Sequence, residues 1–117
     1  MAVVFLIIAA GSALVLAIGI FGLIGKLPRN GWAGIRTPYT MRSDENWQRT
    51  HRFGSPLLIF GSVATLSASL AFLPFALAGK VGDGLAGAVS IGCAVVLGTS
   101  AIASWLYGVN RAKSSAP

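Results

Sequence analysis

Three long apolar segments without a formal charge alternate with shorter polar ones along this chain. They cover residues 2–25, 53–79 and 84–110. The shortest, of 24 residues, would make about 36 Å of α-helix, against a bilayer hydrocarbon core of about 30 Å. Backbone amides in lipid must be bonded within the protein, and these segments lack the apolar and polar alternation of barrel strands. The pattern predicts an all-α integral membrane protein with three transmembrane helices in one domain, residues 1–117.

Prolines and short polar links mark where these helices should begin and end. Ser55 followed by Pro56 matches an N-cap with proline at the first helical position, so the second helix should begin afresh there. Pro74 should either end that helix or kink it. The link Lys80–Asp83 is short and turn-forming, which predicts an antiparallel hairpin of the last two helices. The predicted boundaries are transmembrane helices at residues 2–25, 56–79 and 84–109, a loop at 26–55 and a tail at 110–117.

Charge is concentrated in the first loop. Residues 26–52 contain six of the nine Lys and Arg, and the tail contains two more, whereas the second link has only Lys80, offset by Asp83. Short loops rich in Lys and Arg remain in the cytoplasm. We therefore expect the N-terminus outside and the C-terminus in the cytoplasm. No Lys or Arg precedes residue 26, so the first helix lacks the basic region of a cleaved signal peptide and should be retained.

The net charge of +6 raises the question of a nucleic-acid partner. The basic residues, however, lie where the orientation of a membrane protein places them in any case. Lys and Arg next to a membrane attract anionic lipids, by about 1 kcal/mol each. Anionic lipids are therefore the expected partners, and we expect no nucleic acid.

Small residues recur on one face of each predicted helix. Helices in lipid gain no hydrophobic energy from meeting, so their association depends on close packing of small residues. Such a face serves either packing within one bundle or contact with another chain, which leaves the oligomeric state open. The residues are Gly19, Gly22 and Gly25 in the first helix, Gly61, Thr65 and Ser69 in the second, and Gly84, Ala88, Gly92, Ala94, Gly98, Ser100 and Ser104 in the third.

The first loop shows local structure of its own. The residue before Pro38 is biased to an extended backbone, so residues 31–40 should be irregular chain at the membrane surface. Ser43 offers an N-cap oxygen and two acids follow it, which predicts a short interfacial helix at residues 44–53, ended by Gly54. The aromatic residues expected at the depth of the lipid headgroups are Trp32, Tyr39 and Trp47.

The same loop resembles a known family. Residues 34–54 read GIRTPYTMRSDENWQRTHRFG, and the motifs Gly-x-Arg-Thr-Pro, Ser-x-Glu-x-Trp and His-Arg-Phe-Gly within this run are similar to the signature of the SdpI family. These are small bacterial membrane proteins, named for an immunity protein against a secreted sporulation-delaying killing peptide. The resemblance covers the loop and its two flanking helices, and it implies a multi-pass protein of the inner membrane. The named immunity protein is longer, with further membrane segments ahead of this unit, so this chain resembles a short three-span form.

Seven positions match the family, and all of them except Gly54 are candidate binding residues. On a functional interpretation Arg36, Trp47 and His51 converge into one cytoplasmic pocket or docking surface. On a structural interpretation Arg36 binds a lipid phosphate or caps carbonyl groups at a helix end, Trp47 is an interfacial anchor and His51 is solvated. The matching positions are Arg36, Thr37, Pro38, Trp47, His51, Arg52 and Gly54.

The residues of the chain offer little for catalysis. Asp44 and Glu45 are neighbours, about 100° apart on a helix, and Asp83 is expected on the other side of the membrane, so no pair of carboxyl groups converges. His51 and Cys93 are the only residues of their types and do not make a metal site. We therefore expect no catalytic residue, metal or cofactor, and a small buried apolar role for Cys93.

Two functions from different classes remain. The first is a non-enzymatic binding or immunity module, which recognises a membrane-active peptide or a signalling partner through its loop and helix bundle. The second is an accessory structural subunit that docks its small-residue faces onto a larger membrane complex.

Overall fold

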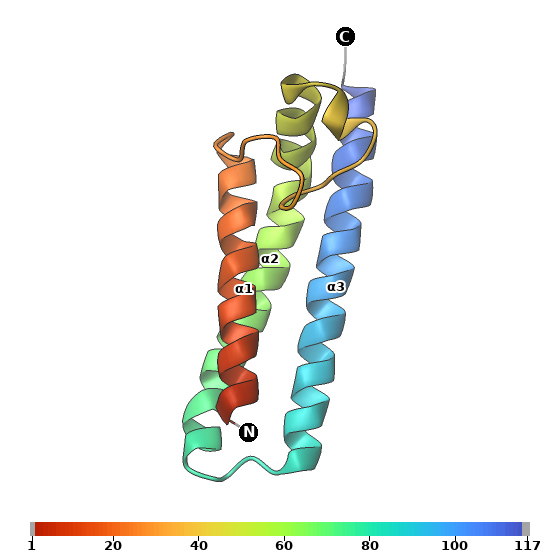
Figure 1. Cartoon of the computed structure of the whole chain (residues 1–117). Coiled ribbons are helices and arrows are strands. Elements are labelled where there is room, and N and C mark those ends of the chain that lie inside the picture. The colour runs from red at the N-terminus through yellow and green to blue at the C-terminus, as the bar shows by residue number, and fades with distance from the viewer. Residues whose placement is uncertain (1, 116–117) are drawn as a thin grey trace.

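Three long helices account for most of the chain in a computed structural model that describes residues 2–115 (Figure 1). They are α1 (Ala2–Leu23), α2 (Asp44–Leu77) and α3 (Asp83–Ser114), with a short 3₁₀ turn, η1 (Thr40–Arg42), before α2. Each helix is long and apolar enough to cross a membrane. The prediction of an all-α chain with three candidate membrane spans is confirmed.

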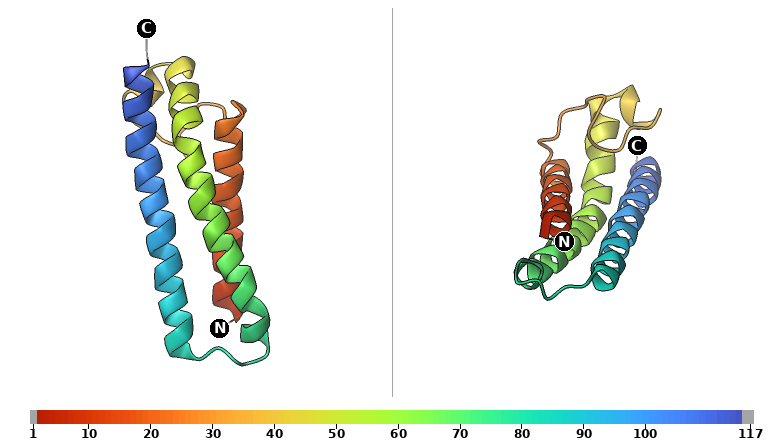
Figure 2. Two further views of the ribbon diagram at one scale, coloured as in Figure 1. Left: turned by 180° about the vertical axis from the view of Figure 1, so that it is seen from behind. Right: turned by 60° about the horizontal axis from the view of Figure 1, so that its bottom comes forward.

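The middle helix in the sequence is also the middle helix in space. α1 and α3 run in the same direction on either side of α2, which runs in the opposite direction (Figures 1 and 2). Both pack along α2 and touch each other much less. The loop between α1 and α2 crosses the end of the bundle where α3 also finishes (Figure 1). That end therefore brings together the loop and the last turns of α3.

α2 is one continuous helix, which corrects the predicted break at residues 54–56. The expected start is present, since the Ser43 hydroxyl accepts a hydrogen bond from the Asn46 N–H at 3.1 Å. The helix then passes through Pro56 and, later, through Pro74 to end at Leu77. No separate interfacial helix exists, because the predicted one is the first part of α2.

Contacts with α3 explain why α2 does not break. Gly54 lies against α3, where an added Cβ would be 2.5 Å from the Ser104 carbonyl oxygen. The Ser104 hydroxyl donates to the Gly54 carbonyl oxygen at 2.7 Å. Pro56 removes only one helical hydrogen bond, the one to the carbonyl group of residue 52. A local preference for a turn is therefore outweighed by tertiary packing.

α2 is longer than a membrane span requires, and its charged residues all lie in its first part. Its 34 residues measure about 51 Å, against a hydrocarbon core of about 30 Å. The uncharged part, residues 53–77, is long enough to span. Residues 44–52 contain all the charged side chains of α2, so they project from the membrane and carry part of the loop.

Small and polar residues form the interface between α1 and α2, as predicted. Gly19 packs so closely on Ile59 that an added Cβ would lie 2.9 Å from the Ile59 Cγ1. Deeper in the membrane the Ser12 and Thr65 hydroxyls form a buried hydrogen bond of 2.9 Å. At the far end the Phe5 ring stacks on Phe72, with ring centroids 5.9 Å apart.

The packing face of α3 agrees with the predicted one only at Ser100 and Ser104. Gly84, Ala88, Gly92 and Gly98 are exposed, and a Cβ added to any of these three glycines would meet nothing within 4 Å. Packing of this face against a second chain stays a prediction. Within the bundle Ser100 and Ser104 pack against α2, on the same side of α3 as other small residues that the prediction left out: Ala86, Cys93, Gly108 and Ala112.

A glycine-to-alanine substitution, made once on each of the two faces of α3, tests which face is packed within the bundle. A Cβ on Gly108 would lie 2.7 Å from the Thr50 carbonyl oxygen and 3.1 Å from the Gly54 Cα. We expect Gly108→Ala to lower the free energy of unfolding in detergent by about 1–3 kcal/mol, through overpacking against backbone. Gly98→Ala is the matched control on the same helix and should leave the thermal midpoint nearly unchanged. Equal midpoints for the two variants would contradict this packing.

Candidate functional site

The first half of the loop folds into a turn against α2. The Asn30 side-chain oxygen accepts hydrogen bonds from the backbone N–H groups of Trp32 at 2.9 Å and Ala33 at 2.6 Å. Asn is favoured in such turns because its side chain can bond backbone groups a few residues on. Leu27 and Ala33 are buried at the two ends of this turn, so the loop is packed onto the helices.

Trp47 connects the start of the loop to α2 through a side-chain hydrogen bond. Its side chain is fully buried, and its Nε1–H donates to the Leu27 carbonyl oxygen at 2.8 Å. The Gln48 amide donates to the same oxygen at 3.0 Å. Trp47 is therefore packed inside the protein and offers no exposed surface to lipid or to a ligand.

His51 holds the middle of the loop. Its Nε2 accepts a hydrogen bond from the Ile35 N–H at 2.9 Å, and its Nδ1 lies 2.7 Å from the Trp47 carbonyl oxygen. An acceptor Nε2 leaves the proton on Nδ1, so the ring is a neutral imidazole that donates to Trp47. The ring centroids of Trp47 and His51 are 4.4 Å apart. The two residues, four positions apart, therefore share one face of α2.

Burial sets the charge state of His51. The residue is only 3% exposed, which excludes a solvated role, and it lies in the charged part of α2 outside the membrane-spanning residues 53–77. Burial lowers the pKa of His51, and the hydrogen bond to the Trp47 carbonyl offsets this in part. Gly34 has φ +105° and passes so close that a Cβ would lie 2.7 Å from the His51 Nε2. Glycine alone fits comfortably between loop and ring.

A pair of threonines closes the turn at Pro38. The Thr37 N–H donates to the Thr40 hydroxyl at 2.8 Å, and the Thr40 N–H donates to the Thr37 hydroxyl at 3.1 Å. Thr40 also donates to the Ile35 carbonyl oxygen at 2.9 Å and is fully buried. Sequence reasoning did not single out Thr40. The signal was present as Thr-x-x-Thr around a proline, since threonine hydroxyls commonly stabilise turns.

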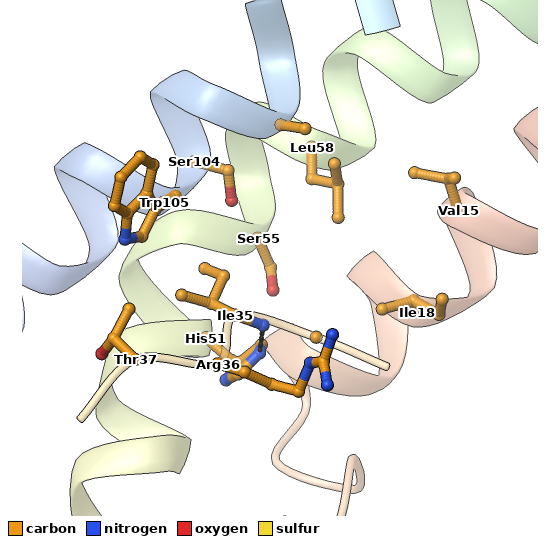
Figure 3. A pocket seen from close by; sticks show the side chains of 12 residues that line it. Val15, Ile18, Ile35, Arg36, Thr37, His51, Ser55, Leu58, Ser104 and Trp105 are labelled. Carbon is orange, nitrogen blue, oxygen red and sulfur yellow. Dashed lines mark hydrogen bonds between the residues drawn. The ribbon is translucent and has the colours of Figure 1, made fainter. Parts of the chain in front are cut away.

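Below the loop lies a pocket of about 440 Å³ between the three helices (Figure 3). Its wall is mainly apolar, and α1, α2, α3 and the loop all contribute to it. The Ser55 hydroxyl and the guanidinium group of Arg36 lie at this pocket (Figure 3). Ser55 had been expected to be an N-cap and was not singled out as a site residue. The apolar lining comes from Val15, Ile18, Ile35, Leu58 and Trp105, and the polar lining from Arg36, Thr37, His51, Ser55 and Ser104.

The structure brings together three of the six candidate binding residues. Arg36, Thr37 and His51 line the pocket, whereas Trp47 lies outside its lining. Pro38 belongs to a separate groove beside α3. Arg52 is exposed and lines neither space. Of the three residues predicted to converge, Arg36 and His51 meet at the pocket and Trp47 does not.

Arg36 is the one charged side chain in the pocket lining. It donates one hydrogen bond to the Gly31 carbonyl oxygen, which leaves further guanidinium N–H groups free to donate. The carboxylates at this end pair with other residues: Asp44 with Arg29 at 3.2 Å and Glu45 with Arg49 at 3.3 Å. Within residues 2–115 no group of three or more His, Cys, Asp or Glu could hold a metal ion.

The neutral state of His51 predicts how stability depends on pH. Above its usual pKa of 6.5 the residue is neutral in both folded and unfolded chains, and its stabilising hydrogen bonds are fully present. As the pH falls below this value the unfolded chain takes up a proton that the folded chain does not, so the free energy of unfolding decreases. We expect the thermal midpoint in detergent to drop between about pH 7 and about pH 5.

A matched variant isolates this effect. The amide oxygen of His51→Gln can accept from the Ile35 N–H but does not titrate. Its thermal midpoint should therefore change less over the same pH range. Equal pH dependence in the two proteins would show that the loss of stability has another origin.

Comparison with known proteins matches the same part of the chain. The model of the SdpI/YfhL protein family matches residues 26–109, which include the loop, α2 and most of α3. Searches of curated proteins and of solved structures gave no match. Since the family model covers well over half of the sequence, this chain belongs to the SdpI/YfhL protein family.

Proposed function

We propose that this membrane protein is a non-enzymatic binding module of the immunity type, and that it recognises a membrane-active peptide in the loop-capped pocket. The observation that carries the proposal is the pocket itself, because the family motif builds its roof and part of its wall. Gly34 to Thr37 cover the pocket, and His51 and Ser55 line it from α2. Its volume of about 440 Å³ lies within the range of about 300–1,000 Å³ typical of ligand sites.

The position of the pocket suits a ligand that arrives within the membrane. α2 forms the back of the pocket and the loop covers it, with Val15 and Ile18 of α1 on one side and Trp105 of α3 on the other (Figure 3). α1 and α3 pack on α2 rather than on each other, so the side between them faces lipid. An apolar segment of a peptide can enter there without leaving the bilayer, and the free donors of Arg36 can bind a peptide carbonyl or carboxylate group.

The chemistry of the pocket supports binding rather than catalysis. Both ring nitrogens of His51 are engaged by the backbone. No carboxylate lines the pocket, so no acid and base pair is available beside a bound ligand. Arg36 and the Ser55 hydroxyl remain as groups that orient a ligand.

Protection by Arg36 variants tests this function. The chain is produced in a susceptible bacterium that is then exposed to the secreted killing peptide for which the family is named. We expect Arg36→Ala to reduce protection about tenfold or more, because it removes a charge-assisted hydrogen bond of about 1.5–3 kcal/mol. The thermal midpoint should change little, since Arg36 is exposed and bonds only the Gly31 carbonyl oxygen.

Two further variants complete this experiment. Arg52→Ala removes the same charge from an exposed position outside the pocket and should protect as well as the unmodified chain. Trp47→Ala should lower the thermal midpoint, because it removes a buried ring and its bond to Leu27. Equal protection by Arg36→Ala and Arg52→Ala would overturn the role of the pocket. Failure of the unmodified chain to protect would overturn the immunity function.

An accessory role in a larger membrane complex is the second candidate. The observation in its favour is the outward face of α3, where Gly84, Gly92 and Gly98 meet nothing in the single chain. Such a face allows close approach of another transmembrane helix. Purification in mild detergent followed by mass spectrometry separates the two functions. A stoichiometric protein partner that is lost in Gly92→Leu would favour the accessory role.

We further propose that the loop end of the bundle faces the cytoplasm of the cell's inner membrane. Arg111 lies over the Phe53 ring and Lys113 over the Tyr39 ring, so the basic residues of α3 and of the loop share one end. Lys80 lies at the opposite end, in the link between α2 and α3. Eight of the nine Lys and Arg thus gather at one surface, which the positive-inside rule assigns to the cytoplasm.

Reporter fusions test this orientation. A reporter after residue 117 should be active in the cytoplasm, whereas one inserted within residues 78–82 should be active only outside. An alkaline phosphatase and a fluorescent protein make suitable paired reporters. Two reporters on the same side would contradict the membrane hairpin of α2 and α3, and exchanged sides would reverse the proposed orientation.

A further inference from the structure

A second, basic groove lies between the loop and the last turns of α3. Tyr39 and Arg42 from the loop and Trp105, Val109 and Lys113 from α3 enclose about 290 Å³. The groove lies at the same end of the bundle as the other loop cations. It is distinct from the loop-capped pocket, although Thr37 and Trp105 contribute to both.

No acid among the described residues balances the charge of this groove. The two carboxylates at this end are paired with Arg29 and Arg49, and no ion pair joins Arg42 or Lys113 to an acid in the part of the chain that the structure describes. The Lys113 Nζ lies 5.4 Å from the centroid of the Tyr39 ring, an arrangement in which the ring holds the ammonium group over the groove. The groove therefore offers two cations to an anion.

Tyr39 adds a hydrogen-bonding group without a partner. Its hydroxyl is buried and bonds no other atom of the described chain. Buried polar groups are nearly always hydrogen-bonded, so an orphan hydroxyl indicates a missing partner. A phosphate oxygen between Arg42 and Lys113 would accept its proton once the flexible Lys113 side chain moves aside.

The surface below the groove is apolar and exposed. Ile102, Trp105, Val109 and Lys113 follow one another at spacings of three and four on α3, which places them on one face of the helix. Ile102 is 56% and Trp105 45% exposed. From Lys113 to Trp105 the helix descends about 12 Å. The face thus passes from a cation through an interfacial tryptophan to a hydrocarbon surface, in the order of the layers of a lipid leaflet.

We infer that this groove binds one anionic phospholipid of the leaflet on the loop side. Its phosphate lies between Arg42 and Lys113 and accepts a hydrogen bond from the Tyr39 hydroxyl. An acyl chain runs down α3 over Trp105 and Ile102. This site is independent of the proposed immunity function, since it does not use Arg36, His51 or Ser55.

Retention of lipid by the purified full chain tests the inference. The chain in detergent is mixed with phosphatidylglycerol or with the zwitterionic phosphatidylcholine, and bound lipid is counted by native mass spectrometry. We expect one phosphatidylglycerol to be retained in preference to phosphatidylcholine. The double variant Arg42→Gln and Lys113→Gln should weaken its retention about tenfold or more, as two cations next to a phosphate are lost.

Two variants separate a built site from general attraction. Lys80→Gln and Arg52→Gln together remove the same charge elsewhere and should retain lipid like the unmodified chain. Equal loss in both double variants would overturn the inference. Tyr39→Phe should weaken retention severalfold without lowering the thermal midpoint, because the hydroxyl bonds nothing in the free protein. Unchanged lipid retention in Tyr39→Phe would show that the hydroxyl is not part of the site.

A competition arm distinguishes a lipid from a free anion. Glycerol phosphate and inorganic phosphate carry the same headgroup chemistry without a chain. They should compete only weakly, because the acyl chain on Trp105 and Ile102 contributes to binding. Complete displacement of phosphatidylglycerol by inorganic phosphate at equal concentration would show a soluble-anion site and overturn the assignment to a lipid.

Discussion

The loop stays over the bundle because two side chains of one helical turn bond its backbone. Trp47 donates to the Leu27 carbonyl oxygen, and His51 accepts from the Ile35 N–H while it donates to the Trp47 carbonyl. Buried backbone groups without partners are costly, so these bonds decide where an otherwise irregular segment lies. The bonds also exclude two roles, since Trp47 has no exposed surface for a ligand and neither nitrogen of His51 is free to exchange protons.

Because α2 is continuous, the residues that hold the loop lie in line with residues that line the pocket. Trp47, His51, Ser55 and Leu58 follow one another at spacings of three and four, so they share one face of a straight helix. The first two hold the loop, whereas Ser55 and Leu58 lie in the pocket below it. A break at Gly54 would have placed Trp47 and His51 on a different helix from Ser55 and Leu58. The Ser104 hydrogen bond to Gly54 therefore supports the site from α3, and Ser104 itself lines the pocket.

Hydropathy predicted the number and approximate extent of the helices because lipid imposes the same demand on every spanning backbone. The N-cap at Ser43 was equally predictable, since it depends on a side chain and a backbone group three residues apart. The prediction of a helix break at residues 54–56 was wrong for the opposite reason, because contacts with a helix 50 residues away in the sequence outweigh the local preference for a break. The predicted packing face of α3 was right only at Ser100 and Ser104, because small residues line two sides of this helix and the pattern alone does not say which side meets α2.

The site was predictable only in part, for similar physical reasons. Family motifs indicated Arg36, Thr37 and His51, which do meet in one pocket. They grouped Trp47 with these residues, although its role is to hold the loop, and they did not separate Arg52, which points elsewhere. Ser55 was interpreted through its neighbour Pro56 as a helix start, so its place in the pocket could not be anticipated. Spacing along a chain shows which residues share a face but not which faces another element covers.

The pocket and the basic groove are neighbours that share Thr37 and Trp105. A ligand in one can influence the other only by favouring a different arrangement of a shared residue. Thr37 is held in place by its reciprocal bonds with Thr40. Trp105 is half-exposed on α3 and has greater freedom to change its rotamer. A lipid chain in the groove and a peptide in the pocket would therefore contact the same side chain, while their polar groups bind different residues.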